Sequence, residues 1–439
     1  MASVLLRIAF RSLRKNWRHS LGSVLAVAVG FAAVALFDGY LADFERTLTR
    51  LMEERFMMGT LVVEGTGASR ALSRETSGRV YLHAREQAFV DAFLRERAGE
   101  VVVSVRSLFV GGIASNGLSS TPFTGWGQEP AQGAALRRRF AWDAWYGRPL
   151  HAAGGDTVLL ARGLAALLDC LPATREPPFG PDGLPVARER PFTCRRPRVQ
   201  LFGSTGSGQV NAVEATVGGI IDGGRKELDT LMITMPLALA QRYRNTRDVS
   251  AYNVLLRDPS RGAGFARDLS SGARARGLAI DAMPWQASYF GQQYRQGMGI
   301  LWTFRSLMAV VVVGIAGMAV FTTMAKAVSE RTREIGTLRS LGFLRRQVTA
   351  LFALEAALLS AGACVAGLAL TLAVTALVDG AGVTYSAGIL ANPIPLGVAM
   401  DPRDWLRVAA LLTAVAFLAA WLPARRAARR GIPDALAFA

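Results

Sequence analysis

The chain has 439 residues, with 50 Lys and Arg against 33 Asp and Glu, and its formal net charge is +17. Such a charge is typical of nucleic-acid-binding proteins. However, 51% hydrophobic residues, only 19% charged residues and a mean hydropathy of +0.27 do not describe a solvated basic protein. The same composition excludes a disordered chain, and three Cys in this length exclude a scaffold built on disulfides.

Four apolar segments predict membrane-spanning helices, because about 20 apolar residues are needed to cross the hydrocarbon layer. They are residues 21–37, 306–325, 351–378 and 408–422. The last segment is short enough to be a buried core helix instead, although Trp405 and Trp421 near its ends are typical of membrane interfaces. Only the third segment contains an ionisable carboxylate, Glu355.

The positive charge is concentrated in three short segments, residues 1–20, 326–350 and 422–439, which together carry +12 of the +17. Four spans place these three segments on the same side of the membrane. By the positive-inside rule, both termini and the 326–350 loop are therefore cytoplasmic. The N-terminal segment alternates apolar and basic residues at helical spacing and predicts an amphipathic helix in the headgroup layer, not a cleaved signal peptide. Docking of this helix on a partner is the alternative.

Residues 44–299 are then extracytoplasmic, and they are long enough and polar enough for a two-lobed α/β domain. Alternating and β-branched runs predict strands at residues 59–64, 101–110, 156–160, 199–202, 217–221 and 231–234. Helical spacing predicts helices at residues 83–100, 163–168 and 238–243.

A proline-rich stretch interrupts this domain between residues 171 and 198, which contain seven of the 18 prolines. Cys170 and Cys194 flank the stretch. In an oxidising compartment these two residues could form a disulfide that closes the loop, and two separate thiols are the alternative.

Motifs for catalysis or for a bound cofactor are absent from the sequence. The Gly/Ser-rich run at residues 203–209 lacks the Lys of a phosphate-binding loop and predicts a turn. No metal-binding spacing and no carboxylate pair suited to acid–base chemistry occurs, so we expect no catalytic residue, no metal site and no cofactor in this chain. Glu355 lies about one turn inside its span, where it could reach the interface or pair with Arg345 or Arg346.

The cytoplasmic loop predicts a short amphipathic helix at residues 329–342 that ends at Gly342. Ile335, Leu338 and Leu341 form one apolar stripe, and charged residues occupy the opposite face. An isolated helix of this length is not stable in water, so it needs the membrane or a partner groove to lie on.

These motifs resemble a known family. The runs ERTREIG, LRSLG and FALEA at residues 330–336, 338–342 and 352–356 resemble the loop and third span of four-span ABC-transporter permeases, the family that contains MacB, LolC, LolE and FtsX. Further similar segments are residues 158–165, 217–224, 228–229, 235–241, 285, 423–428 and 432–436. In layout the chain is most similar to the LolC and LolE lipoprotein-releasing permeases, although no ATPase domain is fused as in MacB. A LolC-type hook would be expected after residues 199–202, where this chain has only the Gly/Ser turn.

The resemblance implies that the loop helix seats on a separate ATP-binding subunit, which would hold ATP and Mg. It implies polar contacts and an apolar seat made by Glu330, Arg331, Glu334, Ile335, Leu338, Leu341 and Gly342. It also implies two ATPase copies, a second like or unlike permease, and mechanotransmission through helical extensions at residues 38–50 and 285–299. The substrate would be a lipoprotein, a lipid or another lipophilic molecule, released on the periplasmic side of the bacterial inner membrane. The alternative is an FtsX-like protein that moves nothing and transmits ATPase motion to a cell-envelope hydrolase.

The predicted fold is thus an α-helical membrane protein with four transmembrane helices and a large extracytoplasmic α/β domain between the first two. The expected segments are an amphipathic helix (1–20), four transmembrane helices (21–43, 300–328, 350–378 and 405–422), the extracytoplasmic domain (44–299), the coupling loop (329–349), an extracytoplasmic connector (379–404) and a cytoplasmic tail (423–439).

Overall fold

The computed structural model describes residues 17–73, 80–174, 186–206, 208–224, 226–385 and 394–429. The chain divides into two compact units. The helical unit comprises Met1–Glu45, Met298–Val383 and Leu396–Ala439, and the sheet unit comprises Arg46–Gly297 and Thr384–Pro395. Residues 1–16 of the predicted amphipathic helix and residues 430–439 of the predicted tail lie outside the described residues, so these two expectations stay predictions.

Long apolar helices make up the helical unit. They are α2 (Trp17–Arg50), α9 (Tyr289–Glu330), α11 (Arg345–Ala381) and α12 (Pro402–Ala428). Each is long and apolar enough to cross a membrane, in agreement with the four predicted spans. The helices extend beyond the apolar segments because the flanking residues also have helical propensity, and α12 begins where the Asp401 carboxylate accepts a hydrogen bond from the Arg403 amide.

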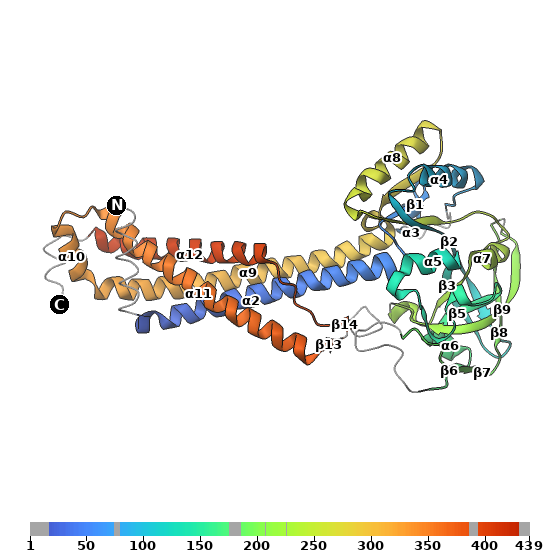
Figure 1. The fold of residues 1–439 in the computed structure, drawn as a ribbon, viewed down its shortest axis with the longest axis horizontal. Coiled ribbons are helices and arrows are strands. Elements are labelled where there is room, and N and C mark those ends of the chain that lie inside the picture. Colours follow the sequence, from blue (N-terminus) through green and yellow to red (C-terminus); the bar gives the residue numbers. More distant parts are fainter. Residues whose placement is uncertain are drawn as a thin grey trace. The chain divides into compact units, whose positions relative to one another are not determined.

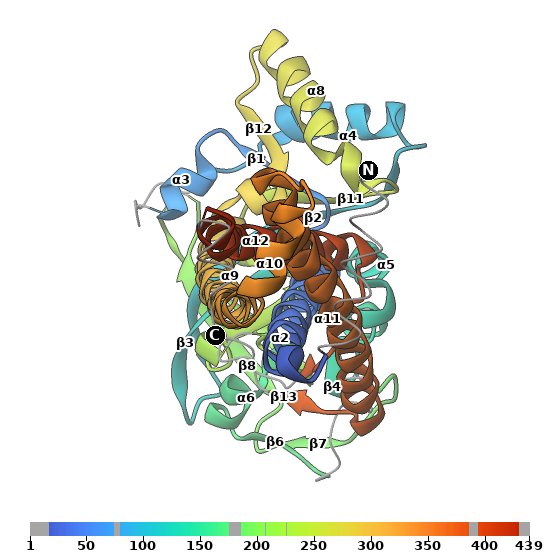
Figure 2. The same ribbon diagram turned by 90° about the vertical axis from the view of Figure 1, so that its left-hand side faces the viewer.

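Small side chains let these helices pack closely. The buried cluster between them combines Phe31 of α2 with Ala and Val positions of the other three helices. Gly367 of α11 lies so close to α2 that an added Cβ would be 2.5 Å from the Ala28 carbonyl oxygen. Asp38 accepts two hydrogen bonds from the Arg305 guanidinium, at 2.6 and 2.9 Å. Figure 2 looks along this unit, with the short helix α10 (Thr332–Ser340) against α11 and α12.

One ten-stranded mixed sheet runs through the sheet unit, with the order β12-β1-β11-β2-β3-β10-β5-β9-β4, and β8 pairs with β2 and β9 (Figure 1). The strands are β1 (Leu61–Gly65), β2 (Val101–Ser115), β3 (Ser120–Gln128), β4 (Ala144–Gly147), β5 (Thr157–Ala161), β8 (Arg198–Ser204), β9 (Val210–Ile221), β10 (Met232–Pro236), β11 (Ala251–Leu256) and β12 (Ile280–Pro284). The hairpins β6 (Cys170–Pro172) with β7 (Phe192–Cys194) and β13 (Thr384–Tyr385) with β14 (Ile394–Pro395) are separate.

Helices cover this sheet. They are α3 (Ala68–Ser73), α4 (Ala84–Glu96), α5 (Pro130–Arg137), α6 (Arg162–Leu167), α7 (Leu237–Arg244) and α8 (Gly262–Ala275). α4 and α8 lie together at the β12 and β1 end, and α6 and α7 lie over the other strands (Figure 1). A single hydrophobic cluster joins both ends, from Leu94 and Phe265 to Val158 and Leu164. The two expected lobes are therefore the two ends of one sheet with one continuous core.

Tyr243 of α7 anchors that helix on the sheet. Its side chain is fully buried, and its hydroxyl lies 2.9 Å from the carbonyl oxygens of Gly111 and Phe202. The contact depends on the glycine at position 203, where a Cβ would be only 1.8 Å from the Tyr243 hydroxyl. Gly203 and Ser204 end β8, and the hydrogen bond from the Thr205 amide to the Gln209 carbonyl closes the hairpin turn between β8 and β9, in agreement with the predicted turn; residue 207 lies outside the described residues.

Two segments connect the sheet unit to the apolar helices. α2 runs without interruption to Arg50 and is followed by a π-helical turn, η1 (Leu51–Arg55). On the return, Trp285 belongs to a 3-10 turn, η6 (Trp285–Ala287), and α9 begins only at Tyr289. Trp285 is fully buried and its indole nitrogen donates to the Glu53 carboxylate at 3.0 Å. The helical extension expected from residue 285 therefore begins later, at Tyr289, because Trp285 is part of the core of the sheet unit.

Candidate functional site

The loop between α9 and α11 folds as expected into one short helix, α10 (Thr332–Ser340). The Thr332 hydroxyl donates to the Ser329 carbonyl oxygen at 2.7 Å, and this contact holds the bend between α9 and α10. Gly342 follows α10 with a φ of +94°, a left-handed conformation that favours glycine and ends the helix. α11 then begins at Arg345, so α10 and the turn at Gly342 make up the connection between α9 and α11.

The predicted apolar stripe of this loop divides into an inner and an outer part. Ile335 is only 1% exposed and packs in a cluster formed with residues of α9, α11 and α12. Leu338 is half-buried, whereas Leu341 is 73% exposed. Leu344, just before α11, is 65% exposed. Ile335 therefore holds α10 on its own chain, and Leu341 and Leu344 are the apolar side chains left at the surface.

Arg331 and Glu355 form an ion pair under this helix. The Arg331 Nη1 atom lies 3.2 and 3.3 Å from the two Glu355 carboxylate oxygens, and the two side chains are 15% and 7% exposed. The sequence suggested Arg345 or Arg346 as the partner, and this was wrong. Both lie more than two turns, roughly 14 Å, from Glu355 along the same helix and are exposed to solvent. The pair instead joins the start of α10 to α11 beneath it.

The exposed face of the loop is therefore polar and basic around two leucines. Of the predicted contact residues, Glu330, Glu334, Leu341 and Gly342 are exposed. Arg331 and Ile335 are turned inward, and Leu338 lies between the two sets. The sequence analysis missed Leu344, an exposed leucine directly after the glycine turn. A leucine between a helix stop and the basic pair at 345 and 346 was the available signal.

No group of three or more His, Cys, Asp or Glu side chains that could hold a metal ion occurs within the described residues. The buried polar groups of this site are those that hold the loop to the helices beneath it. Ile335 and the Arg331–Glu355 pair join the loop and the helix ends into one packed body.

In the sheet unit, a disulfide joins Cys170 to Cys194. The two residues face each other across the β6–β7 hairpin, so the bond closes the proline-rich excursion at its base. Residues 175–185 of that excursion lie outside the described residues. Cys364 is a buried free thiol in α11, where it packs with the core of the helical unit.

Sequence comparison places the described loop within a known domain. Residues 306–432, which run from the apolar part of α9 through α10 and α11 to beyond α12, match the family described as FtsX-like permease C-terminal. The chain therefore contains an FtsX-like permease C-terminal domain over residues 306–432. The permease is also similar to two proteins called "Macrolide export ATP-binding/permease protein MacB". That of Shigella sonnei is 33% identical over 134 residues, and that of Wolinella succinogenes is 32% identical over 115 residues.

These matches cover only part of each protein. They include 30% of the permease and 19% of the Shigella sonnei protein, and 26% and 16% in the case of Wolinella succinogenes. The permease thus spans about a fifth of the length of the curated relatives it matches.

Two solved structures are similar to the permease over about half of its length. The extracellular domain of the noncanonic ABC-type transporter YknZ from Gram-positive bacteria covers 51% of the permease, with 14% identity and a TM-score of 0.31. The periplasmic region of MacB from Actinobacillus actinomycetemcomitans covers 54%, with 10% identity and a TM-score of 0.34. The alignments include 98% and 92% of those two chains.

Proposed function

We propose that the permease is the membrane subunit of an ABC transporter whose ATP-binding subunit docks on the 329–349 loop. The observation that carries this proposal is the pair of exposed leucines, Leu341 and Leu344, beside a basic surface on a loop that is packed firmly against three apolar helices. The ATPase subunit supplies the ATP and Mg chemistry. Two copies of it and a second permease, like or unlike, complete the complex.

The loop and both termini face the cytoplasm of a bacterial cell, and the sheet unit faces the periplasm across the inner membrane. The +12 on the three basic segments supports this orientation. Closure of the ATPase pair pushes on α10, and α9 carries the displacement, since it is one helix from Tyr289 to Glu330. The sheet units then shift and release their cargo without passage through the bilayer, which is mechanotransmission.

The cargo is a lipophilic molecule, either a lipoprotein, a lipid or a smaller amphiphile. The relatives named as macrolide export proteins support the smaller amphiphile, and the layout of the chain supports the lipid-bearing cargo. The alternative is an FtsX-like permease that drives a cell-envelope hydrolase and carries nothing. Affinity purification of the full-length permease separates the two: a co-purifying lipid or lipoprotein supports transport, whereas a hydrolase as its sole envelope partner supports the alternative.

The docking surface is tested with Leu341→Asp in the reconstituted complex. Loss of one leucine that becomes buried on docking costs about 1.5–3 kcal/mol, so affinity for the ATPase subunit should fall roughly tenfold to a hundredfold. Leu118→Asp, at a 47% exposed leucine of the sheet unit, is the matched control and should leave ATPase binding unchanged. Leu338→Asp should uncouple ATP hydrolysis from cargo release, because Leu338 lies at the edge of the same surface. Unchanged ATPase affinity of the Leu341→Asp variant would refute docking at this surface.

A further inference from the structure

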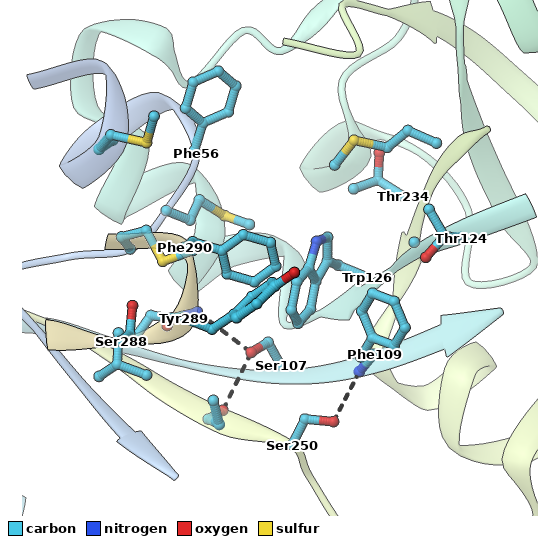
Figure 3. Close-up of a pocket in the computed structure, with 18 of the residues that line it drawn as sticks. Phe56, Ser107, Phe109, Thr124, Trp126, Thr234, Ser250, Ser288, Tyr289 and Phe290 are labelled. Atoms are coloured by element: carbon cyan, nitrogen blue, oxygen red, sulfur yellow. Dashed lines mark hydrogen bonds between the residues drawn. The ribbon is translucent and has the colours of Figure 1, made fainter. Parts of the chain in front are cut away.

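The sheet unit contains a cavity of about 610 Å³ (Figure 3). Its floor is one face of five neighbouring strands, β1, β11, β2, β3 and β10. Each strand contributes two side chains at alternate positions, and these are Val62 and Glu64, Ala251 and Asn253, Ser107 and Phe109, Thr124 and Trp126, and Met232 and Thr234; Gly125, which has no side chain, also lines the cavity. Because side chains alternate between the two faces of a strand, the residues between them point to the other face. Val63, Leu108 and Ile233 are such residues, and they belong to the main hydrophobic core.

An aromatic group forms the middle of the cavity. Figure 3 shows Trp126, Tyr289 and Phe290 side by side above the sheet. The ring centroids of Trp126 lie 4.9 Å from Phe109 and 6.0 Å from Phe290, and Tyr289 lies 5.2 Å from Phe290. All four rings stay partly exposed to the cavity although they are large and apolar. A space of this size, lined by such rings and by a few polar groups, has the properties of a small-molecule site.

Methionines line the cavity next to these rings. Met52 and Met58 lie on its wall and Met232 lies on its floor. Methionine side chains are flexible and polarizable, so they adapt to ligands of different shape. The cavity can therefore adapt to apolar ligands of different outline.

Of the charged side chains that line the cavity, all but one carboxylate form ion pairs. Arg55 pairs with Asp222, and Arg137 pairs with Asp143. The remaining charged residue of the lining is Glu64, which is 7% exposed and accepts a hydrogen bond from the Ser69 amide at 2.9 Å. Within the described ranges, no ion pair to a basic side chain involves it, and Asp281 on β12 adds a second negative charge directly across the strand pair.

Thr234 provides a second polar group that lacks a partner. Its side chain is 2% exposed, and its Oγ1 atom makes no hydrogen bond with the described residues. Buried hydroxyl groups are normally hydrogen-bonded, because desolvation without a partner costs free energy. Figure 3 places Thr234 at the edge of the cavity, near Thr124, where a ligand could supply the missing bond.

From this arrangement we propose that the cavity binds an amphiphile with a largely apolar, aromatic-sized body and one cationic amine, which pairs with Glu64. The aromatic faces stabilise the cation further, since their quadrupoles attract ammonium groups. This inference goes beyond the proposed transport function, and it also names a cargo class for it.

The cavity touches both segments that connect to the apolar helices. Its wall includes Met52 in the turn that follows α2, and Ser288 and Tyr289 at the start of α9. A bound amphiphile therefore contacts the end of one connecting helix and the beginning of the other. A bound ligand can therefore change the conformational equilibrium of α2 and α9, the helices through which the ATPase subunit acts.

Equilibrium binding to the full-length permease in phosphatidylcholine nanodiscs tests the proposal without ATPase subunit or ATP. The two probes are 1-pyrenemethylamine, which is cationic at pH 7, and 1-pyrenemethanol, which has the same apolar body and no charge. Pyrene fluorescence is titrated against permease nanodiscs, and the signal of empty nanodiscs is subtracted. We expect the dissociation constant of the amine to be about tenfold or more below that of the alcohol, since hydrogen bonds to charged groups are stronger than neutral ones.

Variants assign the binding to the cavity. Glu64→Gln should bring the dissociation constants of the two probes to within about threefold of each other. Glu214→Gln, at an exposed carboxylate of β9, should keep the tenfold preference for the amine. Trp126→Ala should weaken both probes about tenfold, because a large aromatic contact is lost. Glu64→Gln is nearly isosteric, so the test holds even if Trp126→Ala does not fold.

Equal affinity of the wild-type permease for the two probes would overturn the proposal. So would binding no greater than in empty nanodiscs, or a preference that Glu64→Gln leaves intact. Because the assay contains no ATPase subunit, a failure here leaves ATPase docking standing. Conversely, loss of ATPase docking in the Leu341→Asp experiment leaves the cavity result standing.

Discussion

Replacing either member of the Arg331–Glu355 pair should loosen the 329–349 loop from the helices beneath it. Both side chains are largely buried, at 15% and 7% exposed, and their charged atoms are 3.2 Å apart. At an effective dielectric constant of about 20, two unit charges at that distance interact with roughly 5 kcal/mol. Desolvation of both groups offsets much of this attraction, so the net value of the intact pair is small.

Removal of one partner has a larger effect, because it leaves the other charge buried without compensation. The expected cost of Glu355→Gln or Arg331→Met is about 3–5 kcal/mol each. The double variant Arg331→Met with Glu355→Gln removes both charges and should cost less than either single variant. Glu330→Gln is the matched control, since Glu330 is 52% exposed and 4.0 Å from Lys326, and it should cost less than about 1 kcal/mol.

The assay is thermal unfolding of the purified permease, together with ATP hydrolysis in the reconstituted complex. For a unit of this size, each kcal/mol lowers Tm by about 2–4 °C. Each single variant should therefore show a clear fall in Tm and a loss of ATPase stimulation by cargo, and the double variant should recover part of both. Strictly additive effects of the two substitutions would refute the reasoning, because they would mean that the two side chains do not interact.

Two further predictions concern the sheet unit. Mass spectrometry of the unreduced protein should find Cys170 linked to Cys194, and Cys170→Ser should cost about 3 kcal/mol, given a loop of this length; two alkylated thiols in unreduced protein would contradict the bond. Burial raises the pKa of the Glu64 carboxyl, so folding favours its protonated form. That stabilisation is complete below the ordinary pKa of glutamate and is lost as pH rises through the raised folded pKa. Glu64→Gln should therefore raise Tm near neutral pH and change it little in acid, and a variant with lowered Tm at neutral pH would show that the charged form is favoured.

Much of the membrane architecture followed from local properties of the chain. About twenty apolar residues in a row form a helix in lipid whatever their neighbours are, because no other structure satisfies the backbone there. The four spans and the turn at Gly342 were therefore readable in order along the chain. Six strands of the sheet were readable for a related reason, since β-branched runs such as residues 101–110 have few other uses in a folded domain. The strands β3, β4, β11 and β12 were not predicted.

Other features needed the tertiary structure, because they depend on residues that are far apart in sequence. Ile335 looked equivalent to Leu341 on one helical stripe, and only the packing of α11 and α12 beneath α10 turned the first inward and left the second exposed. In the same way, Glu355 had basic neighbours in sequence on its own helix. Its partner is Arg331, because the bend between α9 and α10 brings the Arg331 side chain to within 3.2 Å of the Glu355 carboxylate. Arg345 and Arg346 lie on the same rigid helix as Glu355 and are held roughly 14 Å away from it.

The sequence by itself determined the number and order of the spans, the orientation signal in its basic segments and the short helix between spans two and three. Each of these depends on composition or periodicity within one continuous segment. The tertiary structure alone decided which loop residues face outward, which charge Glu355 meets and that a cavity exists above the sheet. Five strands drawn from the stretch between residues 61 and 256 place two side chains each on the cavity floor, and pairing between strands is a long-range choice that no local pattern encodes.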